Sequence, residues 1–244
     1  MTAVRLERVT KSFGSRKVLD DVTLEVPPRV AFVILGRSGT GKSVTLRHII
    51  GLVRPDSGRV FVDGDEISAL DGAELSAVRK KIGFLFQNAA LFDSISVGEN
   101  VAFPLRRHTR HPDAEIRRRA QEKLDAVGLG KEYDKMPAAL SGGMRKRAGL
   151  ARAMALDPSI LLVDEPSAGL DPITADEIDE LLLSLKQSGT TIIVVTHNIP
   201  SARRIGDHLV MLHEGRIAAE GTAAELENSS SELVRAFMRS QHAG

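Results

Sequence analysis

The sequence predicts an α/β protein with a mixed central sheet, an antiparallel β part at the N-terminus and an inserted α-helical subdomain. Short apolar runs alternate with segments of helical periodicity along most of the chain, which is typical of a parallel sheet covered on both faces. Residues 4–9 and 18–26 instead alternate apolar and polar side chains, as half-buried antiparallel strands do. From 88 to about 135 the periodicity is helical and charge is dense, which predicts the subdomain.

The composition is that of an ordinary globular protein with a sizeable core: 244 residues, 42% hydrophobic and 27% charged. A formal net charge of +1 gives no electrostatic reason to expect a nucleic-acid partner. The absence of cysteine excludes disulfides and thiolate metal sites. No apolar run approaches the roughly 18–20 residues that cross a bilayer, and the N-terminal segment lacks the apolar core of a signal peptide. We therefore expect a cytoplasmic chain that reaches a membrane only through a partner.

The elements of the first half follow from local pattern. A turn at 11–14, which carries Phe13, separates the first two strands, and the apolar run 29–35 is a buried strand followed by a helix to about Leu52. The next expected elements are a turn at 55–58, a strand from 59 to the turn at 63–65, a helix at 71–80 and a strand at 82–86.

In the second half, Pro104 and Pro112 are expected to break the helical subdomain into pieces, and the charge run at 115–123 is interpreted as a solvated helix face. There follow a helix at 143–156, a strand at 160–163, a helix at 173–186, strands at 191–195 and near 208–212, and an amphipathic helical tail at 222–241. The chain thus divides into a core of 1–87 and 158–221, a helical subdomain of about 88–157 and a tail of 222–244.

The segment GRSGTGKS fits G-x-x-x-x-G-K-[ST], the pattern of the phosphate-binding loop of nucleoside triphosphatases. It stands between a predicted strand and a predicted helix, which argues against a chance glycine turn. Glycines let successive backbone N–H groups point at one anion, Lys42 can reach the β- and γ-phosphates, and the Ser43 hydroxyl can bind Mg²⁺. The residues expected to bind the nucleotide are Gly36, Arg37, Ser38, Gly39, Thr40, Gly41, Lys42 and Ser43.

A second constellation begins with the apolar run 160–163, which ends in Asp164 and Glu165. Ligands bind at the C-terminal ends of strands in an open α/β sheet, so both carboxylates are expected beside the phosphates. Asp164 would hold Mg²⁺, directly or through water, and Glu165 would orient or deprotonate the attacking water. The alternative is that Asp-Glu-Pro only caps a helix. His197 follows another apolar strand and can reach a γ-phosphate, although a loop histidine without a catalytic role is the alternative.

With these motifs in order, the chain resembles the ATPases of ATP-binding-cassette (ABC) transporters over nearly its whole length. The segment LSGGM at 140–144 is similar to the signature loop of that family. The resemblance implies that Phe13 stacks on adenine, that Gln87 senses Mg²⁺ and the transporter, and that Asp171 lies in a dimer-contact loop. It implies that the metal ligands are Ser43, Gln87 and Asp164. It also implies three catalytic residues, which are Glu165 as general base, His197 as switch histidine and Gln87.

Two residues depart from the family pattern. Phe13 replaces the commoner Tyr, which keeps the stacking surface and loses only a hydroxyl. Met144 replaces the usual Gln at the fifth signature position, while Ser141, Gly142 and Gly143 remain, so the phosphate contact of the loop should survive.

The signature loop precedes a helix, and a helix N-terminus is itself an anion site. It belongs to the helical subdomain, far from the phosphate loop of the same chain. The resemblance therefore implies a head-to-tail dimer held together by ATP and released by hydrolysis. Each ATP would lie between one phosphate loop and the partner copy's signature and dimer-contact residues, which are Ser141, Gly142, Gly143, Met144 and Asp171.

The finer resemblance is to the ATPase of Mla-type phospholipid transport systems, and it rests on FLFQNAALFDSISVGENVAFPLRRH and LSGGMRKRAGLARAMALDPSILLVDEP. That group serves membrane permeases with mammalian-cell-entry (MCE) substrate-binding proteins. The alternative is an importer of amino acids or another small solute. A non-transport ABC ATPase would carry a long coiled coil or two fused cassettes, and a P-loop kinase or GTPase would lack the signature loop.

The expected partners are a second copy, a permease at the inner face of the cell membrane and an MCE-type protein, but no nucleic acid.

The permease is expected to dock in a groove between the two lobes, beside the stretch 87–104. That stretch holds more apolar residues than a solvated loop needs, namely Leu91, Phe92, Ile95, Val97, Val101 and Phe103. The alternative is that they fill the small core of the helical subdomain. Some are expected to stay exposed, so that a permease helix can insert.

Overall fold

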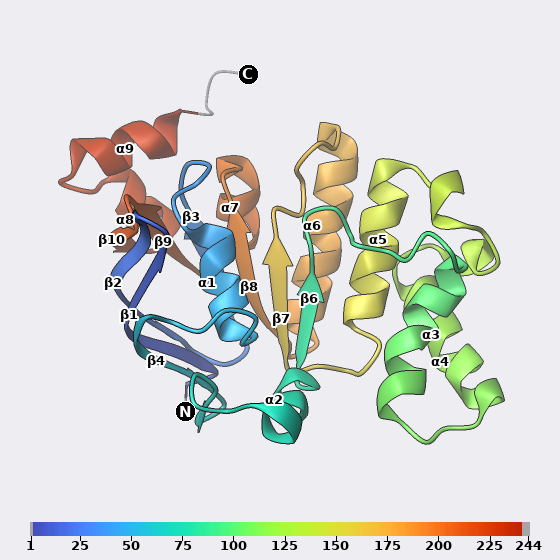
Figure 1. Cartoon of the computed structure of the whole chain (residues 1–244). Helices are drawn as coiled ribbons and strands as arrows, with labels where there is room; N and C mark the ends of the chain where they lie inside the picture. Colours follow the sequence, from blue (N-terminus) through green and yellow to red (C-terminus); the bar gives the residue numbers. More distant parts are fainter. Residues whose placement is uncertain (1, 241–244) are drawn as a thin grey trace.

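The computed structural model describes residues 2–240, and Figure 1 shows their arrangement. The strands are β1 (Val4–Phe13), β2 (Arg16–Val26), β3 (Ala31–Leu35), β4 (Ser57–Val62), β5 (Asp65–Glu66), β6 (Ile82–Leu85), β7 (Ile160–Asp164), β8 (Thr191–Thr196), β9 (His208–His213) and β10 (Arg216–Gly221). The α-helices are α1 (Lys42–Ile49), α2 (Gly72–Arg79), α3 (Val97–His108), α4 (Asp113–Ala126), α5 (Gly142–Ala153), α6 (Pro172–Gln187), α7 (Ile199–Ile205), α8 (Ala223–Glu227) and α9 (Glu232–Arg239), and two short 3-10 helices, Gly130–Glu132 and Pro137–Ala139, lie between α4 and α5.

The strands of the described chain form two sheets. An antiparallel sheet has the order β2-β1-β4-β5, and a larger sheet has the order β10-β9-β3-β8-β7-β6. In the larger sheet the neighbours from β9 to β6 are parallel, and β10 pairs with β9 in the antiparallel sense. The central sheet is therefore mixed, and the expected α/β class with an antiparallel N-terminal part is confirmed.

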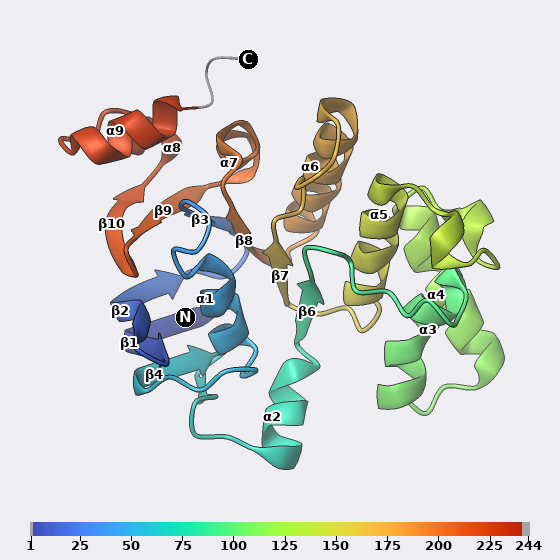
Figure 2. The same cartoon turned by 45° about the horizontal axis from the view of Figure 1, so that its top comes forward.

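Strands β3, β6, β7 and β8 of the central sheet are buried on both faces, which explains why they are almost entirely apolar. In β3, Phe32 and Ile34 point into a core shared with α1 and the antiparallel sheet. Val33 and Leu35 point into the core on the opposite face, which includes the helices from α3 to α7. In Figures 1 and 2 the antiparallel sheet and α1 lie at one end of the molecule, and α3, α4 and α5 lie at the other.

The helical subdomain differs from expectation at one proline. Pro104 lies inside α3 and does not end it, so the expected break at this position is wrong. A proline removes one backbone donor, but α3 continues because its buried face, which includes Val101 and Leu105, packs into the core. Pro112 does mark a boundary, since it is the N-cap of α4. Ser96 begins α3, and its Oγ accepts a hydrogen bond from Glu99 N at 3.2 Å.

Other boundaries also shift. Strand β1 continues through the expected turn to Phe13, because residues 11–13 still pair with β2, and the chain turns only at 14–15. Helix α7 and strand β10 were not expected from the sequence. The tail contains two short helices, α8 and α9, and the part of the expected tail from 241 onward lies outside the described residues.

Within residues 2–240, the structure contains no helix with the length and apolar character needed to cross a bilayer.

Candidate functional site

Three strands end at the same edge of the central sheet, and the loops that follow them form the site. Strand β8 lies between β3 and β7, with Leu35 opposite Thr196 and Asp164 opposite Val195. All three run parallel, so the phosphate-binding loop, the segment after Asp164 and His197 leave the sheet side by side. This is the edge at which ligands bind in open α/β sheets.

The phosphate-binding loop wraps around the ammonium of Lys42. Nζ donates to the carbonyl of Gly36 at 2.8 Å and to that of Arg37 at 3.1 Å. Gly41, the N-cap of α1, has φ +105°, and a Cβ there would lie 2.7 Å from the side chain of Leu19. Only glycine fits this position, because the conformation and the space both exclude a side chain.

Two carboxylates reach the loop from the end of β7. Ser43 Oγ donates to Asp164 Oδ1 at 2.8 Å, and Lys42 Nζ lies 3.4 Å from Glu165 Oε1. Asp164 and Glu165 are 7% and 8% exposed. Burial raises the pKa of Asp164, while the Ser43 hydrogen bond and the positive charges of Arg47 and Lys42 oppose that rise. The alternative that these carboxylates cap a helix is wrong, because the next helix begins later and Asp171 caps it.

Glu165 also connects the loop to His197. Its Oε2 accepts from Thr196 Oγ1 at 3.1 Å and from the backbone N of His197 at 3.3 Å, and Nδ1 of that imidazole lies 2.9 Å away. Glu165 has φ +48°, a left-handed conformation that is uncommon for residues other than glycine. The half-exposed His197 and the buried Lys42 therefore meet on opposite oxygens of one carboxylate.

The donors in this part of the site fit a hard divalent cation. Ser43 and Asp164 present a hydroxyl and a carboxylate oxygen to each other, and oxygen is the ligand type that Mg²⁺ prefers. Among residues 2–240, no cluster of three or more His, Cys, Asp or Glu could hold a metal alone. A cation that takes few protein ligands and completes its shell with water and substrate phosphates, as Mg²⁺ does, matches this set.

Most of the remaining predicted residues form a second group, at the starts of α5 and α6. Ser141 is the N-cap of α5, and its Oγ accepts from Met144 N at 3.2 Å. Asp171 is the N-cap of α6, and its Oδ1 accepts from Thr174 N at 3.0 Å. A Cβ on Gly143 would lie 2.2 Å from the Thr174 side chain, so the two helix starts are in direct contact.

Gln87 lies between the two groups, just after β6, which pairs with β7, and Met144 belongs to the second group. A pocket of about 280 Å³ brings Gln87 together with Gly142 and Leu170. The side chain of Met144 is partly buried and packs against the core. In both views of the fold, α5 lies on the far side of β7 and β6 from α1, so the signature residues at its start lie away from the phosphate-binding loop of the same chain (Figures 1 and 2). Phe13 is 49% exposed at the end of β1 and pairs with Arg16 of β2, whose guanidinium donates to the carbonyl of Gly39 in the phosphate-binding loop.

Three residues that sequence patterns did not indicate contact these groups. Arg16 donates to the carbonyl of Gly39 at 3.0 Å, and Thr196 holds Glu165 as described. Lys146, in the first turns of α5, donates to three carbonyls of the segment after Asp164. Burial lowers the pKa of Lys146 to about 8, although the negative charges of Glu165 and Asp164 oppose the shift. Only the position of Thr196, at the end of an apolar strand, carried a usable signal.

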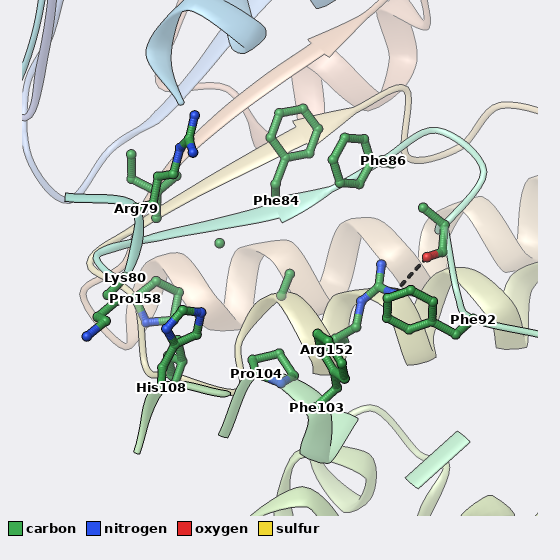
Figure 3. A pocket seen from close by; sticks show the side chains of 15 residues that line it. Arg79, Lys80, Phe84, Phe86, Phe92, Phe103, Pro104, His108, Arg152 and Pro158 are labelled. Atoms are coloured by element: carbon green, nitrogen blue, oxygen red, sulfur yellow. Dashed lines mark hydrogen bonds between the residues drawn. The ribbon is translucent and has the colours of Figure 1, made fainter. Parts of the chain in front are cut away.

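A further pocket, of about 370 Å³, lies between the core and the helical subdomain (Figure 3). Phe92 and Phe103 stand in it, each 46% exposed, with ring centroids 5.0 Å apart. The Arg152 guanidinium beside them donates to the carbonyls of Ala89 and Ala90, both at 2.7 Å. Of the expected docking residues, Val97 and Val101 are fully buried in the core, so only part of that set faces solvent.

The site is that of a P-loop nucleoside triphosphatase. It consists of a strand, a glycine loop and a helix that carries Lys42, with two carboxylates at the end of a neighbouring strand. The sequence model described as ABC transporter matches residues 19–168. The chain therefore belongs to the ABC transporter family, as an ATPase.

Named relatives cover nearly the whole chain. It is 44% identical over 243 residues to a "Probable ribonucleotide transport ATP-binding protein mkl" of Mycobacterium leprae, covering 99% of this chain and 70% of that protein. It is 40% identical over 236 residues to the "Intermembrane phospholipid transport system ATP-binding protein MlaF" of Escherichia coli K12, with 96% and 88% covered. It is also 40% identical over 240 residues to the "Methionine import ATP-binding protein MetN" of Caulobacter vibrioides, with 97% and 72% covered.

Two solved structures of a bacterial ABC transporter cassette, MJ0796, share the fold. A dimeric structure has a TM-score of 0.85 at 36% identity, covering 90% of this chain and 98% of that one. A dimeric post-hydrolysis state bound to ADP and Pi has a TM-score of 0.84 at the same identity and coverage. The expected ABC ATPase fold is thereby confirmed.

Proposed function

We propose that this ABC ATPase hydrolyses Mg²⁺-bound ATP as a head-to-tail dimer and drives a membrane permease that moves phospholipid between membranes. The observation that carries the enzymatic part is the contact of Glu165 with Lys42 on one oxygen and with His197 on the other. A buried carboxylate held on both sides, at the edge where a triphosphate would lie, suits a group that must orient water.

The phosphate-binding loop, from Gly36 to Ser43, would hold the triphosphate. Lys42 already presents its ammonium within the loop and would bind the β- and γ-phosphates, and Phe13 would stack on the base. Ser43 and Asp164, with Gln87, would hold Mg²⁺. When bound, this cation would neutralise part of the phosphate charge. Glu165 would take the proton of the attacking water, and His197, partly exposed at the same edge, would contact the γ-phosphate.

The second group would complete the site of another copy. The N-terminus of α5 presents the backbone of Gly142 and Gly143 beside the Ser141 cap, which is suited to an anion. Because this group lies away from α1 in its own chain, it could contact only a partner's ATP. The dimeric state of the solved relatives supports this arrangement. In it, Ser141, Gly142, Gly143, Met144 and Asp171 would face the partner's nucleotide.

The pocket between the lobes would receive the permease. Phe92 and Phe103 give it an exposed apolar floor, and its charged lining residues are Arg79, Lys80, His108 and Arg152, with no acidic residue among those that line it. An amphipathic helix with an apolar face and an acidic side chain complements this surface. Docking there would hold the chain at the cytoplasmic face of the cell membrane.

The cargo proposal depends on the similarity to MlaF, which covers 96% of this chain, and on the segments around Phe92 and Met144 that resemble Mla-type ATPases. A permease with an MCE-type partner would then present the lipid. The similarity to MetN, also 40% identical, favours a second candidate, import of an amino acid or similar solute. The relative named for ribonucleotide transport extends that candidate to nucleotides.

Reconstitution separates these candidates. The chain would be purified with its permease, placed in proteoliposomes and supplied with ATP, while transfer of a fluorescent phospholipid and uptake of methionine and a ribonucleotide are measured in parallel. We expect ATP-dependent lipid transfer that the Glu165→Gln variant does not support. Solute uptake without lipid transfer would replace the lipid proposal with the importer.

A further inference from the structure

Lys146 is the residue through which the start of α5 contacts the catalytic segment of the same chain. We propose that Lys146 is a positioning residue for ATP hydrolysis, which holds the backbone of Glu165 in a fixed relation to the signature loop. This inference rests on the proposed role of Glu165 as general base.

The first support is the completeness of the contact. Nζ donates to the carbonyls of Glu165 at 3.0 Å, Pro166 at 2.6 Å and Ala168 at 2.9 Å. An ammonium has three N–H donors, so all of them are used on this one segment. Lys146 is only 6% exposed, and burying an ammonium is unfavourable unless its hydrogen bonds are satisfied.

The second support is that this segment lacks other regular structure. Residues 165–170 belong to no helix or strand, and Glu165 itself holds a left-handed backbone conformation. Converging carbonyls repel one another, and a cation at their centre stabilises the curve of the backbone. The backbone that carries the Glu165 side chain is therefore held by a group that belongs to α5.

The third support is the position of Lys146 on its helix. α5 begins at Ser141, and one turn before Lys146 its Gly143 packs tightly against Thr174 of α6. The segment from 165 to 174 is thus held to α5 at both ends, by Lys146 and by that glycine contact. A movement of the signature loop would move the Glu165 backbone with it, so engagement of a partner's ATP would be coupled to this chain's own hydrolytic site.

Variants at Lys146 test the inference. Lys146→Met keeps the length of the side chain and removes the donors, and Lys146→Arg retains a cation with N–H groups. A displacement of about 1 Å in a reacting group can lower a rate about a hundredfold, so we expect kcat of Lys146→Met to fall at least about tenfold. KM for ATP should change less than about threefold, because Lys42 and its loop are untouched. Lys146→Arg should restore part of the lost kcat.

The controls separate positioning from stability and from the role of Glu165. Lys123→Met removes an ion-paired lysine of α4, far from the site, and should leave kcat and KM unchanged. Melting temperatures would be recorded for every variant. Wild-type kcat in Lys146→Met would overturn the inference, and so would a joint loss of kcat, ATP affinity and melting temperature that Arg does not relieve. Glu165→Gln is assayed beside them: if it stays active, the proposed base is wrong, whereas an inactive Glu165→Gln with an active Lys146→Met refutes only the role of Lys146.

Discussion

Lys42 and Glu165 face each other inside the site, with Nζ 3.4 Å from Oε1. Both side chains are buried, and each has other partners: Lys42 donates to two loop carbonyls, and Glu165 accepts from Thr196 and His197. The ion pair holds the proposed base and the proposed phosphate-binding cation within reach of one ligand. Substitutions of the two residues are expected to have different effects, because Lys42 is proposed to bind phosphate and Glu165 to activate water.

For Lys42→Ala, we expect ATP binding to be largely abolished. The β- and γ-phosphates lose their direct cation, and a charge-assisted hydrogen bond of about 1.5–3 kcal/mol corresponds to roughly a ten- to hundredfold loss of affinity. Titration with ATP measures this loss. Lys186→Ala, which removes a lysine paired with Asp207 away from the site, is the matched control. If Lys42→Ala and wild type bind ATP with equal affinity, the loop is not the ATP-binding site.

Glu165→Gln is expected to bind ATP normally and to hydrolyse it at least about a hundredfold more slowly, a usual scale for losing a positioned base. The amide keeps the shape of the side chain and its contact with Thr196, so the fold should not change. ATP should then hold two chains together, which light scattering detects. Glu122→Gln, an exposed change on α4, is the control. Turnover near the wild-type rate would show that another group activates water.

Asp164→Asn tests the metal assignment. Asparagine can still accept the hydrogen bond from Ser43, so the variant mainly removes the carboxylate charge. Loss of one group that supports a metal site commonly lowers metal affinity about ten- to a hundredfold. We therefore expect the Mg²⁺ concentration for half-maximal ATPase activity to rise at least about tenfold. The measurement is ATPase rate against Mg²⁺ concentration, with Asp157→Asn as control. An unchanged Mg²⁺ curve would place the cation elsewhere.

The strand-end residues of the site could be predicted because their positions depend on local pattern. Gly36 to Ser43 is a contiguous motif, and parallel strands bring their C-terminal ends to one edge, so Asp164 had to lie near it. Pro104 was misjudged because proline usually ends a helix, whereas here packing of the buried face of α3 outweighs the missing hydrogen bond. Tertiary packing depends on residues that are distant in the sequence, so the residues next to Pro104 do not indicate it.

Lys146 shows why the rest of the site was missed. It contacts the carbonyl of a residue 19 positions away, on a different element. Carbonyl acceptors belong to the backbone, so no residue type marks them in a sequence. In addition, a lysine in a helix rich in arginine is expected to lie on a solvent-exposed face. Only the packing of α5 against the segment after β7 reveals that this lysine is buried.

Acidification is expected to destabilise the chain through His48, a buried residue of α1. Its Nδ1 lies 2.8 Å from the Val44 carbonyl, whereas Nε2 is buried without a hydrogen-bond partner within residues 2–240. Burial lowers the pKa of His48 below the usual 6.5, and the charge of Lys11 acts in the same direction. The neutral ring is therefore favoured in the folded state. Its contribution to stability is present above pH 6.5 and is lost as pH falls from there through the lower folded pKa.

Urea unfolding at pH 7, 6 and 5 measures this effect. One proton taken up on unfolding corresponds to at most about 1.4 kcal/mol per pH unit, and wild type should lose up to that much more than His48→Leu. The comparison uses the slope with pH, because leucine also changes the packing of α1. Parallel slopes in the two proteins would show that His48 does not take up this proton.

Phe92→Glu is expected to release the chain from membranes that contain its permease, while ATP binding is retained. Phe92 is 46% exposed and stands beside Phe103 and Arg152 in the pocket between the lobes (Figure 3). A carboxylate there would remove the apolar contact with the partner helix and repel the acidic side chain that the pocket is proposed to receive. The backbone of the loop should keep its shape, because Asn100 holds Phe92 N and O through its side-chain amide at 2.8 and 3.0 Å.

Sedimentation of permease-containing vesicles measures this release, with Leu52→Glu as the matched control. Leu52 is also exposed, at 53%, but does not line the pocket, so the same charge at that position should leave binding unchanged. Protein-free liposomes separate docking from direct contact with lipid. If wild type sediments with them, or if Phe92→Glu remains bound to permease vesicles, the pocket is not the docking surface. If both glutamate variants dissociate, the loss reflects charge in general, and the specific contact of Phe92 is refuted.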